Sequence, residues 1–397
     1  MPNFKTLNDI DVTERRVLVR ADLNVPMSDG QVTDNSRLSS LVPTLKELVD
    51  RRAKICVLSH LGRPGGKVVR DLSLKPVSLA LSECLGQPVS FASDCIGSEA
   101  KSIVSELDEG EIVVLENLRF YPEEEDNDIN FARSLAKHGD LYVNDAFSVS
   151  HRAHASTAAI ANLLPSAAGR LMELELDSLT NAFMDPKRPL IAIIGGSKIS
   201  TKIDLLVSLS QKVDSLIIGG GMANTFLNAT GVSVGKSLCE SDMAATARKI
   251  MEAARDNECN IVLPIDAVVS KKLETGSLAQ TVDINEIPQD KMVLDVGPKS
   301  LMVMSKIIRG GKTVIWNGPI GAFEIKPFDH GTGVLSKLTG DLSIKGNICS
   351  IAGGGDTVAA LNQSGVTDLF SYVSFAGGAF LEWLEGKTLP GVEVLTR

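Results

Sequence analysis

Aromatic residues and paired cysteines are scarce in this sequence, and both shortages narrow the class of protein. Aromatic side chains make up only 4% of the 397 residues, a low share for an all-β sandwich and an ordinary one for an α/β protein rich in aliphatic residues. The six cysteines are scattered and form no Cys-x-x-Cys pair. In a chain long enough to build its own cores, a disulfide framework is not expected, and the thiols are predicted to be reduced.

Long apolar runs and an excess of positive charge are also missing. No run of about 18 apolar residues could cross a membrane, and the N-terminal segment lacks the apolar stretch of a secretory signal, so we expect a cytoplasmic protein without a membrane partner. The formal net charge of -9 at pH 7 argues against general nucleic-acid binding. An anionic ligand must therefore be held by a local positive pocket.

The sequence does contain short Val- and Ile-rich runs that alternate with longer helical patterns, which is typical of parallel sheets with crossover helices. The expected strands include residues 16–20, 55–59, 112–115, 141–144, 190–194, 216–218, 261–263, 313–316, 348–351 and 372–374. We predict an α/β fold with two Rossmann-like parallel-sheet domains, because the length exceeds that of one ordinary core. The expected parts are an N-terminal domain at 1–168, an interdomain helix and hinge at 169–188, and a C-terminal domain at 189–379.

Most of the arginines lie in the N-terminal half. Arginine grips phosphate or carboxylate groups through paired hydrogen bonds, and several of these arginines follow predicted strands. Arg20, Asp22 and Asn24 alternate at the end of the first strand, which would place them on one face. The other polar residues that follow strands are His60, Arg63, Arg119 and Arg152. Together they predict a pocket for a small polyanion, whereas others, such as Arg133, are expected to be surface residues.

A metal pair is the alternative explanation for one of these segments. His151 and His154 are three residues apart, which on a helix would allow both to bind one ion. No Cys or carboxylate cluster completes a tetrahedral set of ligands. The polyanion is therefore the favoured interpretation.

Glycines directly follow five predicted strands of the C-terminal half, and the longest groups are 219–221 and 353–355. Glycine permits a sharp turn or the close approach of a ligand, and open α/β sheets bind ligands at the carboxyl ends of their strands. The chain nevertheless lacks a P-loop. Its three Gly-Lys-Ser/Thr triplets, at Lys236, Lys312 and Lys387, have no glycine at the first position of that motif.

The favoured nucleotide site is residues 193–202, where a strand ends in two glycines and a helix is expected to begin. Lys198 and Lys202 are expected to share a face of that helix with a polyphosphate between them, and the alternative is two solvated lysines. Asp356, at the start of another predicted helix, is either an N-cap or a ligand of Mg²⁺ beside nucleotide phosphates. Glu324 could accept hydrogen bonds from ribose hydroxyls.

In combination these segments resemble the phosphoglycerate kinase family. The stretches that carry the resemblance, in family order, are residues 19–26, 60–64, 115–120, 143–156, 195–202, 219–226, 316–324 and 353–357. The resemblance implies Mg²⁺-dependent, reversible phosphoryl transfer between ATP and the carboxylate of 3-phosphoglycerate, which gives ADP and 1,3-bisphosphoglycerate in glycolysis. It also implies a monomer, and a C-terminal segment at 380–397 that returns to the first domain.

The resemblance further implies roles for individual residues. Those expected to bind phosphoglycerate are Asp22, Leu23, Asn24, Arg37, His60, Leu61, Gly62, Arg63, Arg119 and Arg152. Those expected to bind the nucleotide are Lys202, Gly219, Gly220, Asn317, Glu324, Gly354, Gly355, Asp356 and Thr357, with Asp356 also on the metal. Arg37 and Lys198 are the expected catalytic residues. Two segments depart from the family pattern: Phe375 stands where a threonine is usual, and Ser148-Val149-Ser150 replaces a Gly-Thr-Ala run.

The expected mechanism needs no general base, because a carboxylate acceptor is already ionised at pH 7. Catalysis would consist of positioning and charge neutralisation by Arg37, Lys198, Mg²⁺ and helix N-termini, with hinge closure to bring the two half-sites together. A dinucleotide-dependent dehydrogenase is a poorer fit because no Gly-x-Gly-x-x-Gly follows the first strand. A nucleotide-binding protein without turnover is the non-enzymatic alternative.

Overall fold

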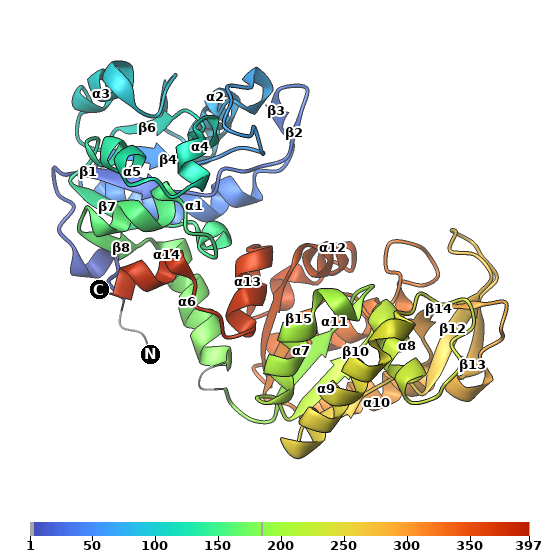
Figure 1. Ribbon diagram of the computed structural model, residues 1–397. Helices are drawn as coiled ribbons and strands as arrows, with labels where there is room; N and C mark the ends of the chain where they lie inside the picture. The colour runs from blue at the N-terminus through green and yellow to red at the C-terminus, as the bar shows by residue number, and fades with distance from the viewer. Residues whose placement is uncertain (1–3, 184–185, 397) are drawn as a thin grey trace. The chain divides into compact units, whose positions relative to one another are not determined.

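The computed structural model describes residues 4–183 and 186–396, which form two compact units (Figure 1). The first unit contains the chain up to Asp177 together with the segment from Thr388 onward, and the second contains Ser178–Lys387. Each unit is built on a six-stranded sheet whose neighbouring strands are all parallel. The predicted α/β class with two parallel sheets is confirmed. The predicted hinge at 169–188 includes residues 184 and 185, which lie outside the described residues.

The sheet of the first unit has the order β5-β6-β4-β1-β7-β8. Its strands are β1 (Arg16–Arg20), β4 (Lys54–Leu58), β5 (Ser90–Ala92), β6 (Ile112–Leu115), β7 (Leu141–Asn144) and β8 (Ser166–Ala168). Val17 and Val19 point to one face, where they pack with α1 (Ser36–Asp50) and α2 (Lys75–Leu85). Leu18 points to the opposite face, with α3 (Gly97–Ser105) and α5 (Ile129–Ala136). The two-residue periodicity of a strand thus supplies two separate cores.

Shorter elements complete the first unit. They are the hairpin of β2 (Met27–Ser28) and β3 (Gln31–Val32), the helices α4 (Pro122–Glu125) and α14 (Pro390–Glu393), the π-helical η5 (Ala155–Ala159), and the 3-10 turns η1 (Leu7–Asp9), η2 (Arg70–Leu72), η3 (Leu118–Phe120), η4 (Phe147–Val149), η6 (Ile160–Asn162) and η11 (Val394–Thr396). The C-terminal segment is bonded to this unit through Gly391, whose N–H donates to the Ser150 carbonyl at 2.9 Å. The Gly391 carbonyl in turn accepts from Nδ2 of Asn144 at 3.0 Å.

The sheet of the second unit has the order β11-β10-β9-β15-β16-β17. Its strands are β9 (Leu190–Ile194), β10 (Ser215–Ile218), β11 (Asn260–Val262), β15 (Thr313–Asn317), β16 (Cys349–Gly353) and β17 (Tyr372–Ser374). Ile191 and Ile193 pack on one face with α10 (Pro298–Gly310), α11 (His330–Ile344) and α12 (Gly355–Gln363). The other helices are α7 (Ile203–Ser210), α8 (Gly220–Ala229), α9 (Ala244–Asp256) and α13 (Gly377–Leu384), of which α7 contacts both α9 and α13.

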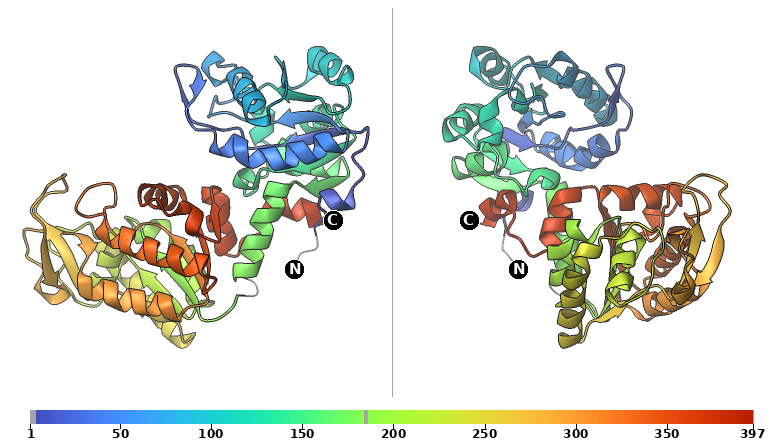
Figure 2. Two further views of the ribbon diagram at one scale, coloured as in Figure 1. Left: turned by 180° about the vertical axis from the view of Figure 1, so that it is seen from behind. Right: turned by 45° about the vertical axis from the view of Figure 1, so that its right-hand side comes forward.

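A second, antiparallel sheet in this unit was not expected from the sequence. It has the order β13-β12-β14 and consists of β12 (Asp266–Ser270), β13 (Gln280–Asp283) and β14 (Met292–Val296), which follow one another along the chain (Figure 2). Ala267 and Val269 form a small core of their own with α8. The remaining turns are η7 (Ile199–Thr201), η8 (Ser241–Met243), η9 (Ile284–Glu286) and η10 (Thr367–Leu369).

The connections at the unit boundaries differ in detail from the expectation. The linking helix α6 (Arg170–Phe183) begins inside the first unit and ends inside the second. Residues 380–387 belong to the second unit, because α13 contacts α7 and the Leu384 carbonyl accepts from the Ser208 hydroxyl at 2.9 Å. The segment that returns to the first unit therefore starts at Thr388. Among the described helices, none combines the length and the apolar character needed to cross a bilayer.

Candidate active site

The polar residues of the first unit meet where its parallel strands end. Arg20, the last residue of β1, is paired in register with Leu58 of β4 and with Asn144 of β7. The loops after these strands therefore leave the sheet at one edge. They carry Asp22 and Asn24 after β1 and His60 after β4. Because β1 ends at Arg20, the predicted alternation on one strand face does not extend to Asp22 and Asn24.

Asp22 and Asn24 hold Arg37 and the next loop in place. The Arg37 guanidinium donates to Oδ2 of Asp22 at 2.7 Å and to the backbone carbonyl of Asn24 at 3.0 Å. Oδ1 of Asn24 accepts from the Gly62 N–H at 2.8 Å, which ties the two strand-end loops together. Asp22 also accepts a hydrogen bond from the Ser148 hydroxyl. The Arg37 side chain keeps 35% of its surface exposed, so the charge is oriented yet still accessible to a ligand.

Arg119 is held more deeply in the same region. Its guanidinium donates to the Gly62 carbonyl at 2.9 Å and pairs with Oε1 of Glu125 at 3.1 Å. Arg152 donates from Nε to Nε2 of His151 at 3.2 Å. Arg63 is exposed, and its side chain forms no hydrogen bond or ion pair with the described residues. Leu23 and Leu61 are buried, so they can offer a ligand only their backbone.

His60 and His154 carry little positive charge at neutral pH. Burial lowers the pKa of His60 well below its usual value, and the charges of Arg20 and Arg119 lower it further. Burial, followed by the charge of Arg119, lowers the pKa of His154 to about 4. Neutral histidines among arginines leave the arginines as the source of positive charge. Such a cluster suits an anion, because charge-assisted hydrogen bonds from a guanidinium are strong.

One part of this region was missed by the sequence analysis. Glu124 is fully buried and accepts hydrogen bonds from both the hydroxyl (2.6 Å) and the backbone N–H (3.0 Å) of Ser156. Its only sequence signal is its place in the acidic run at 123–126, which resembles an ordinary surface stretch. The metal pair considered for His151 and His154 also lacks support. Across the described ranges, no group of three or more His, Cys, Asp or Glu side chains could hold a metal ion.

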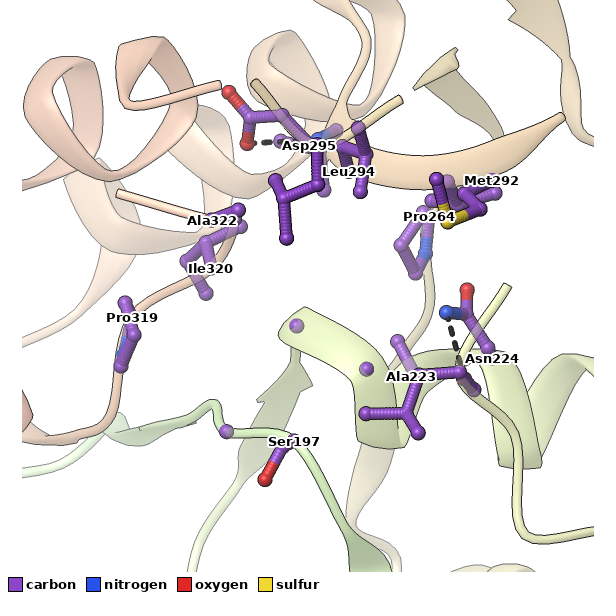
Figure 3. A pocket seen from close by; sticks show the side chains of 18 of the residues that line it. Ser197, Ala223, Asn224, Pro264, Met292, Leu294, Asp295, Pro319, Ile320 and Ala322 are labelled. Atoms are coloured by element: carbon purple, nitrogen blue, oxygen red, sulfur yellow. Dashed lines mark hydrogen bonds between the residues drawn. The ribbon is translucent and has the colours of Figure 1, made fainter. Parts of the chain in front are cut away.

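The second unit contains a pocket of about 380 Å³ along the rim of its sheet (Figure 3). In Figure 3, Ser197 and Pro319 lie toward the lower left of the pocket, and Ala223 and Met292 lie toward its right-hand side. Most of the lining is apolar or backbone, and its acidic side chains are those of Asp295, Glu324 and Asp356. An apolar pocket with a few polar groups is the usual form of a small-molecule site.

Glycines bring the backbone close to this pocket. Gly220 has φ +67° and lies so near Gly196 that a Cβ would be 2.6 Å from its carbonyl oxygen. Gly220 also donates its N–H to the Ile320 carbonyl at 2.6 Å, and Gly219 donates to the Ile194 carbonyl at 3.0 Å. These bonds join the loops that follow three different strands. A side chain at Gly220 would force them apart.

Lys202 and Lys198 are placed differently from the prediction. Helix α7 begins only at Ile203, and the 3-10 turn η7 separates the two lysines, so they do not share a helix face. The Lys202 ammonium donates to the Gly195 carbonyl at 2.7 Å and to Oδ1 of Asn317. Burial lowers the pKa of Lys202 to about 8, and the Asp356 carboxylate partly offsets this effect. Lys198, by contrast, is exposed.

Asn317 and Thr357 connect the remaining loops of the rim. Nδ2 of Asn317 donates to the Gly353 carbonyl at 2.7 Å, and the Thr357 hydroxyl accepts from the Gly318 N–H at 2.7 Å. Gly354 has φ +99°, and a Cβ there would lie 2.5 Å from Nδ2 of Asn317. Asp356 follows in the first turn of α12, exposed to solvent. A single exposed carboxylate fits Mg²⁺ that arrives with phosphates, since Mg²⁺ usually takes one or two carboxylates plus substrate oxygens.

Comparison with known proteins gives a consistent result over the whole chain. The family model described as phosphoglycerate kinase matches residues 7–387. A phosphoglycerate kinase of Rhizobium meliloti (strain 1021) is 56% identical over 393 residues, covering 99% of this chain and 98% of the relative. One from Chelativorans sp. (strain BNC1) is 54% identical over 398 residues and covers 100% of both chains. The solved structure of phosphoglycerate kinase from Coxiella burnetii superposes with a TM-score of 0.92 at 40% identity, covering 99% of each chain.

Proposed function

The chain belongs to the phosphoglycerate kinase family and has that kinase activity of glycolysis, and we propose that its first unit binds the phosphoglycerate while its second unit binds the nucleotide. The phosphoryl group moves reversibly between ATP and the carboxylate of 3-phosphoglycerate, and ADP and 1,3-bisphosphoglycerate are the products when ATP is the donor. The observation that carries the assignment of the first unit is the oriented, accessible guanidinium of Arg37 among further arginines.

In the first unit, the arginines meet the negative groups of the substrate and the loops set their spacing. Arg37 is held by Asp22, and Arg119 by Glu125 and the Gly62 carbonyl. We assign substrate binding to the whole predicted set: Asp22, Leu23, Asn24, Arg37, His60, Leu61, Gly62, Arg63, Arg119 and Arg152. Leu23, Leu61 and Gly62 act through their backbones, since the two leucine side chains are buried.

In the second unit, the nucleotide occupies the rim pocket of Figure 3. The apolar lining receives the base, Glu324 accepts hydrogen bonds from the ribose, and the start of α12 faces the phosphates. We assign nucleotide binding to Lys202, Gly219, Gly220, Asn317, Glu324, Gly354, Gly355, Asp356 and Thr357. Lys202 contributes chiefly by holding the loop of Gly195 against Asn317.

Asp356 is the residue that would hold Mg²⁺ together with the nucleotide phosphates. When bound, Mg²⁺ neutralises phosphate charge. The Thr357 hydroxyl is occupied by the Gly318 N–H and the Gly353 carbonyl, at 2.7 and 2.8 Å. Its role is therefore to fix the loop that carries Asp356.

Catalysis rests on position and charge rather than on proton transfer. The accepting carboxylate is ionised at neutral pH, and the neutral histidines of the first unit are not required as bases. Arg37 and Lys198 are the catalytic residues, and they stabilise negative charge on the transferring phosphoryl group. Lys198 is suited to this because it is exposed and, within the described residues, its ammonium forms no hydrogen bond or ion pair.

Closure of the two units about the linking segment 169–188 brings the half-sites together and excludes water that would otherwise accept the phosphoryl group. Small-angle scattering is expected to show a smaller radius of gyration with both substrates than with neither. An identical radius in both states would contradict closure. The protein is proposed to act as a cytoplasmic monomer, and light scattering across a concentration series tests its mass.

Substitution of Arg37 tests the assignment of the two sites. Arg37→Ala is expected to raise KM for 3-phosphoglycerate by about 10- to 100-fold, the loss of one charge-assisted hydrogen-bonding group, with little change in KM for ATP. The matched control is Arg133→Ala, because Arg133 is an exposed arginine of the same unit whose side chain, within the described part of the chain, bonds Asn130 of its own helix. Equal effects on both KM values, or none on either, would refute the assignment.

A further inference from the structure

Arg20 is a fully buried arginine at the centre of the first sheet. It ends β1, which lies between β4 and β7, and its side chain has no exposed surface. Burying a guanidinium is costly unless its donors are used. All three of its nitrogens have partners: Nε donates to the Ser156 hydroxyl at 2.8 Å, Nη1 to the Ala21 carbonyl, and Nη2 lies 3.2 Å from Nδ1 of His60.

The contact with His60 has only one chemically allowed sense. A guanidinium has donors and no acceptor, so Nδ1 of His60 must be the acceptor and cannot carry a proton. A neutral imidazole with a bare Nδ1 has its proton on Nε2. That nitrogen is also the one that the bond to Arg20 leaves for a ligand.

We propose that Arg20 is a positioning residue that fixes His60 as the neutral Nε2–H tautomer, so that His60 offers the phosphoglycerate a hydrogen-bond donor rather than a cation. The role of His60 as a donor to phosphoglycerate rests on the proposed function of the first unit. The tautomer of His60 is a property of the ligand-free protein. Arg20 itself touches no substrate in this arrangement and acts through His60.

The position of Arg20 is in turn fixed by Ser156 and Glu124. The Ser156 hydroxyl that accepts from Arg20 donates to Oε1 of Glu124 at 2.6 Å, and the Ser156 N–H donates to Oε2 at 3.0 Å. The Tyr142 hydroxyl holds the Ser156 carbonyl at 2.8 Å. The chain of bonds therefore runs from a buried carboxylate through a hydroxyl and a guanidinium to the imidazole. A lysine cannot replace Arg20 here, because an ammonium lacks the planar fork that reaches Ser156 and His60 together.

The charges that face His60 agree with a neutral ring. They are Arg20 from β1, Arg119 from η3, Arg37 from α1 and the neutral His154, and together with burial they place the pKa of His60 well below its usual value. Glu124 faces His154, with Oε1 3.9 Å from Nδ1 of that ring. Protonating His60 would put a fourth cation among three arginines. Anion binding through His60 is consequently independent of pH near neutrality.

Long-range ¹H–¹⁵N spectra of the ligand-free, full-length protein labelled at histidine test the tautomer directly. The chain has five histidines, and the signals of His60 are identified by their loss in His60→Gln. We expect the Nε2–H pattern at pH 7, with no conversion to the imidazolium down to pH 5.5. An Nδ1–H pattern or a charged ring at pH 7 would overturn the proposal, whatever the protein binds.

Variants of Arg20 test its role as the positioning residue. Arg20→Lys is expected to give a mixture of His60 tautomers, whereas Arg16→Lys, on the same strand but paired with Asp140 near the surface, should leave the spectrum unchanged. If Arg20→Lys does not fold, Ser156→Ala removes the anchor of the guanidinium and is expected to broaden or shift the His60 signals. An unchanged pure tautomer in every folded variant would refute the role of Arg20.

Two substitutions of His60 separate this inference from the proposed substrate site. The amide nitrogen of Gln reaches the place of Nε2, whereas that of Asn reaches the place of Nδ1. In calorimetric titrations, His60→Asn is expected to weaken 3-phosphoglycerate binding about 10- to 100-fold, and His60→Gln by less than about fivefold. If neither variant weakens binding, the assignment of His60 to the substrate is wrong while the tautomer result stands. If Gln is as damaging as Asn, the donor role of Nε2 is wrong.

Discussion

Lys198 offers the sharpest test of the proposed chemistry, because its substitution should change catalysis without changing the fold. It is exposed, it precedes the short turn η7, and its ammonium forms no hydrogen bond or ion pair with any described residue. Surface substitutions of this kind usually alter stability by less than about 0.5 kcal/mol. Lys198→Ala is therefore expected to leave the midpoint of thermal unfolding in place.

The expected effect on the reaction is large. Removal of one preorganised group that stabilises the transition state typically lowers kcat by roughly 10²- to 10³-fold. Because Lys198 is free to reach the transferring phosphoryl group rather than to bind the resting substrates, KM for ATP and for 3-phosphoglycerate should change little. A coupled assay of 1,3-bisphosphoglycerate formation at saturating ATP, Mg²⁺ and 3-phosphoglycerate measures this directly.

Two controls make the result interpretable. Lys306→Ala removes another exposed lysine of the second unit, on α10 and away from the rim, and should leave kcat unchanged. Rapid-quench measurement of a single turnover shows whether chemistry or a later step has slowed. An unchanged kcat in Lys198→Ala, or an equal loss in Lys306→Ala, would refute the catalytic assignment.

Three further outcomes follow from the packing of the two units. Burial lowers the pKa of Lys202 from 10.5 to about 8, so between these values the folded state binds fewer protons than the unfolded state and the free energy of unfolding should rise with pH. The rise is on the order of 3 kcal/mol. Urea unfolding from pH 7.5 to 10.5 should show it in the unmodified protein and not in Lys202→Met. Ser148→Ala removes a hydrogen bond to Asp22, and urea unfolding is expected to show a loss of about 1 kcal/mol in the free energy of unfolding. The same variant should have a KM for 3-phosphoglycerate that is raised a few-fold, and a lowered KM would contradict this role. Gly354→Ala places a Cβ 2.5 Å from a neighbouring amide nitrogen and should weaken ATP binding in calorimetry. The control Gly365→Ala, at a glycine that also has a positive φ but open space around it, should leave ATP binding unchanged. Equal effects of the two substitutions would show that backbone strain alone is responsible.

Much of the fold could be predicted from the sequence because its central strands are short, apolar and followed by glycine or polar loops. The strands predicted at 16–20, 112–115, 141–144, 190–194 and 372–374 have the bounds found in the structure. The edge strands β5 and β8 were missed, since Ser90–Ala92 and Ser166–Ala168 have only three residues each and include serine. The antiparallel sheet of β12, β13 and β14 was also missed, because its strands show no common pattern and β13 is largely polar.

The residues of the site likewise differ in how far the sequence alone could predict them. Because a motif is a local feature, the sequence by itself identified the loops that follow the strands, the absence of a P-loop and the family to which the chain belongs. The environment of each side chain depends on contacts between segments far apart in the chain, and only the tertiary structure supplied it. The Lys202 ammonium, which was expected to face a ligand, also holds two loops together, and Arg20, which was expected to line the pocket, is fully buried and contacts His60. Glu124 looks like one of several surface acids in the sequence, yet the fold encloses it beside Ser156, where the charges of Arg20, more than a hundred positions away, and of Arg119 partly offset the cost of burying its carboxylate.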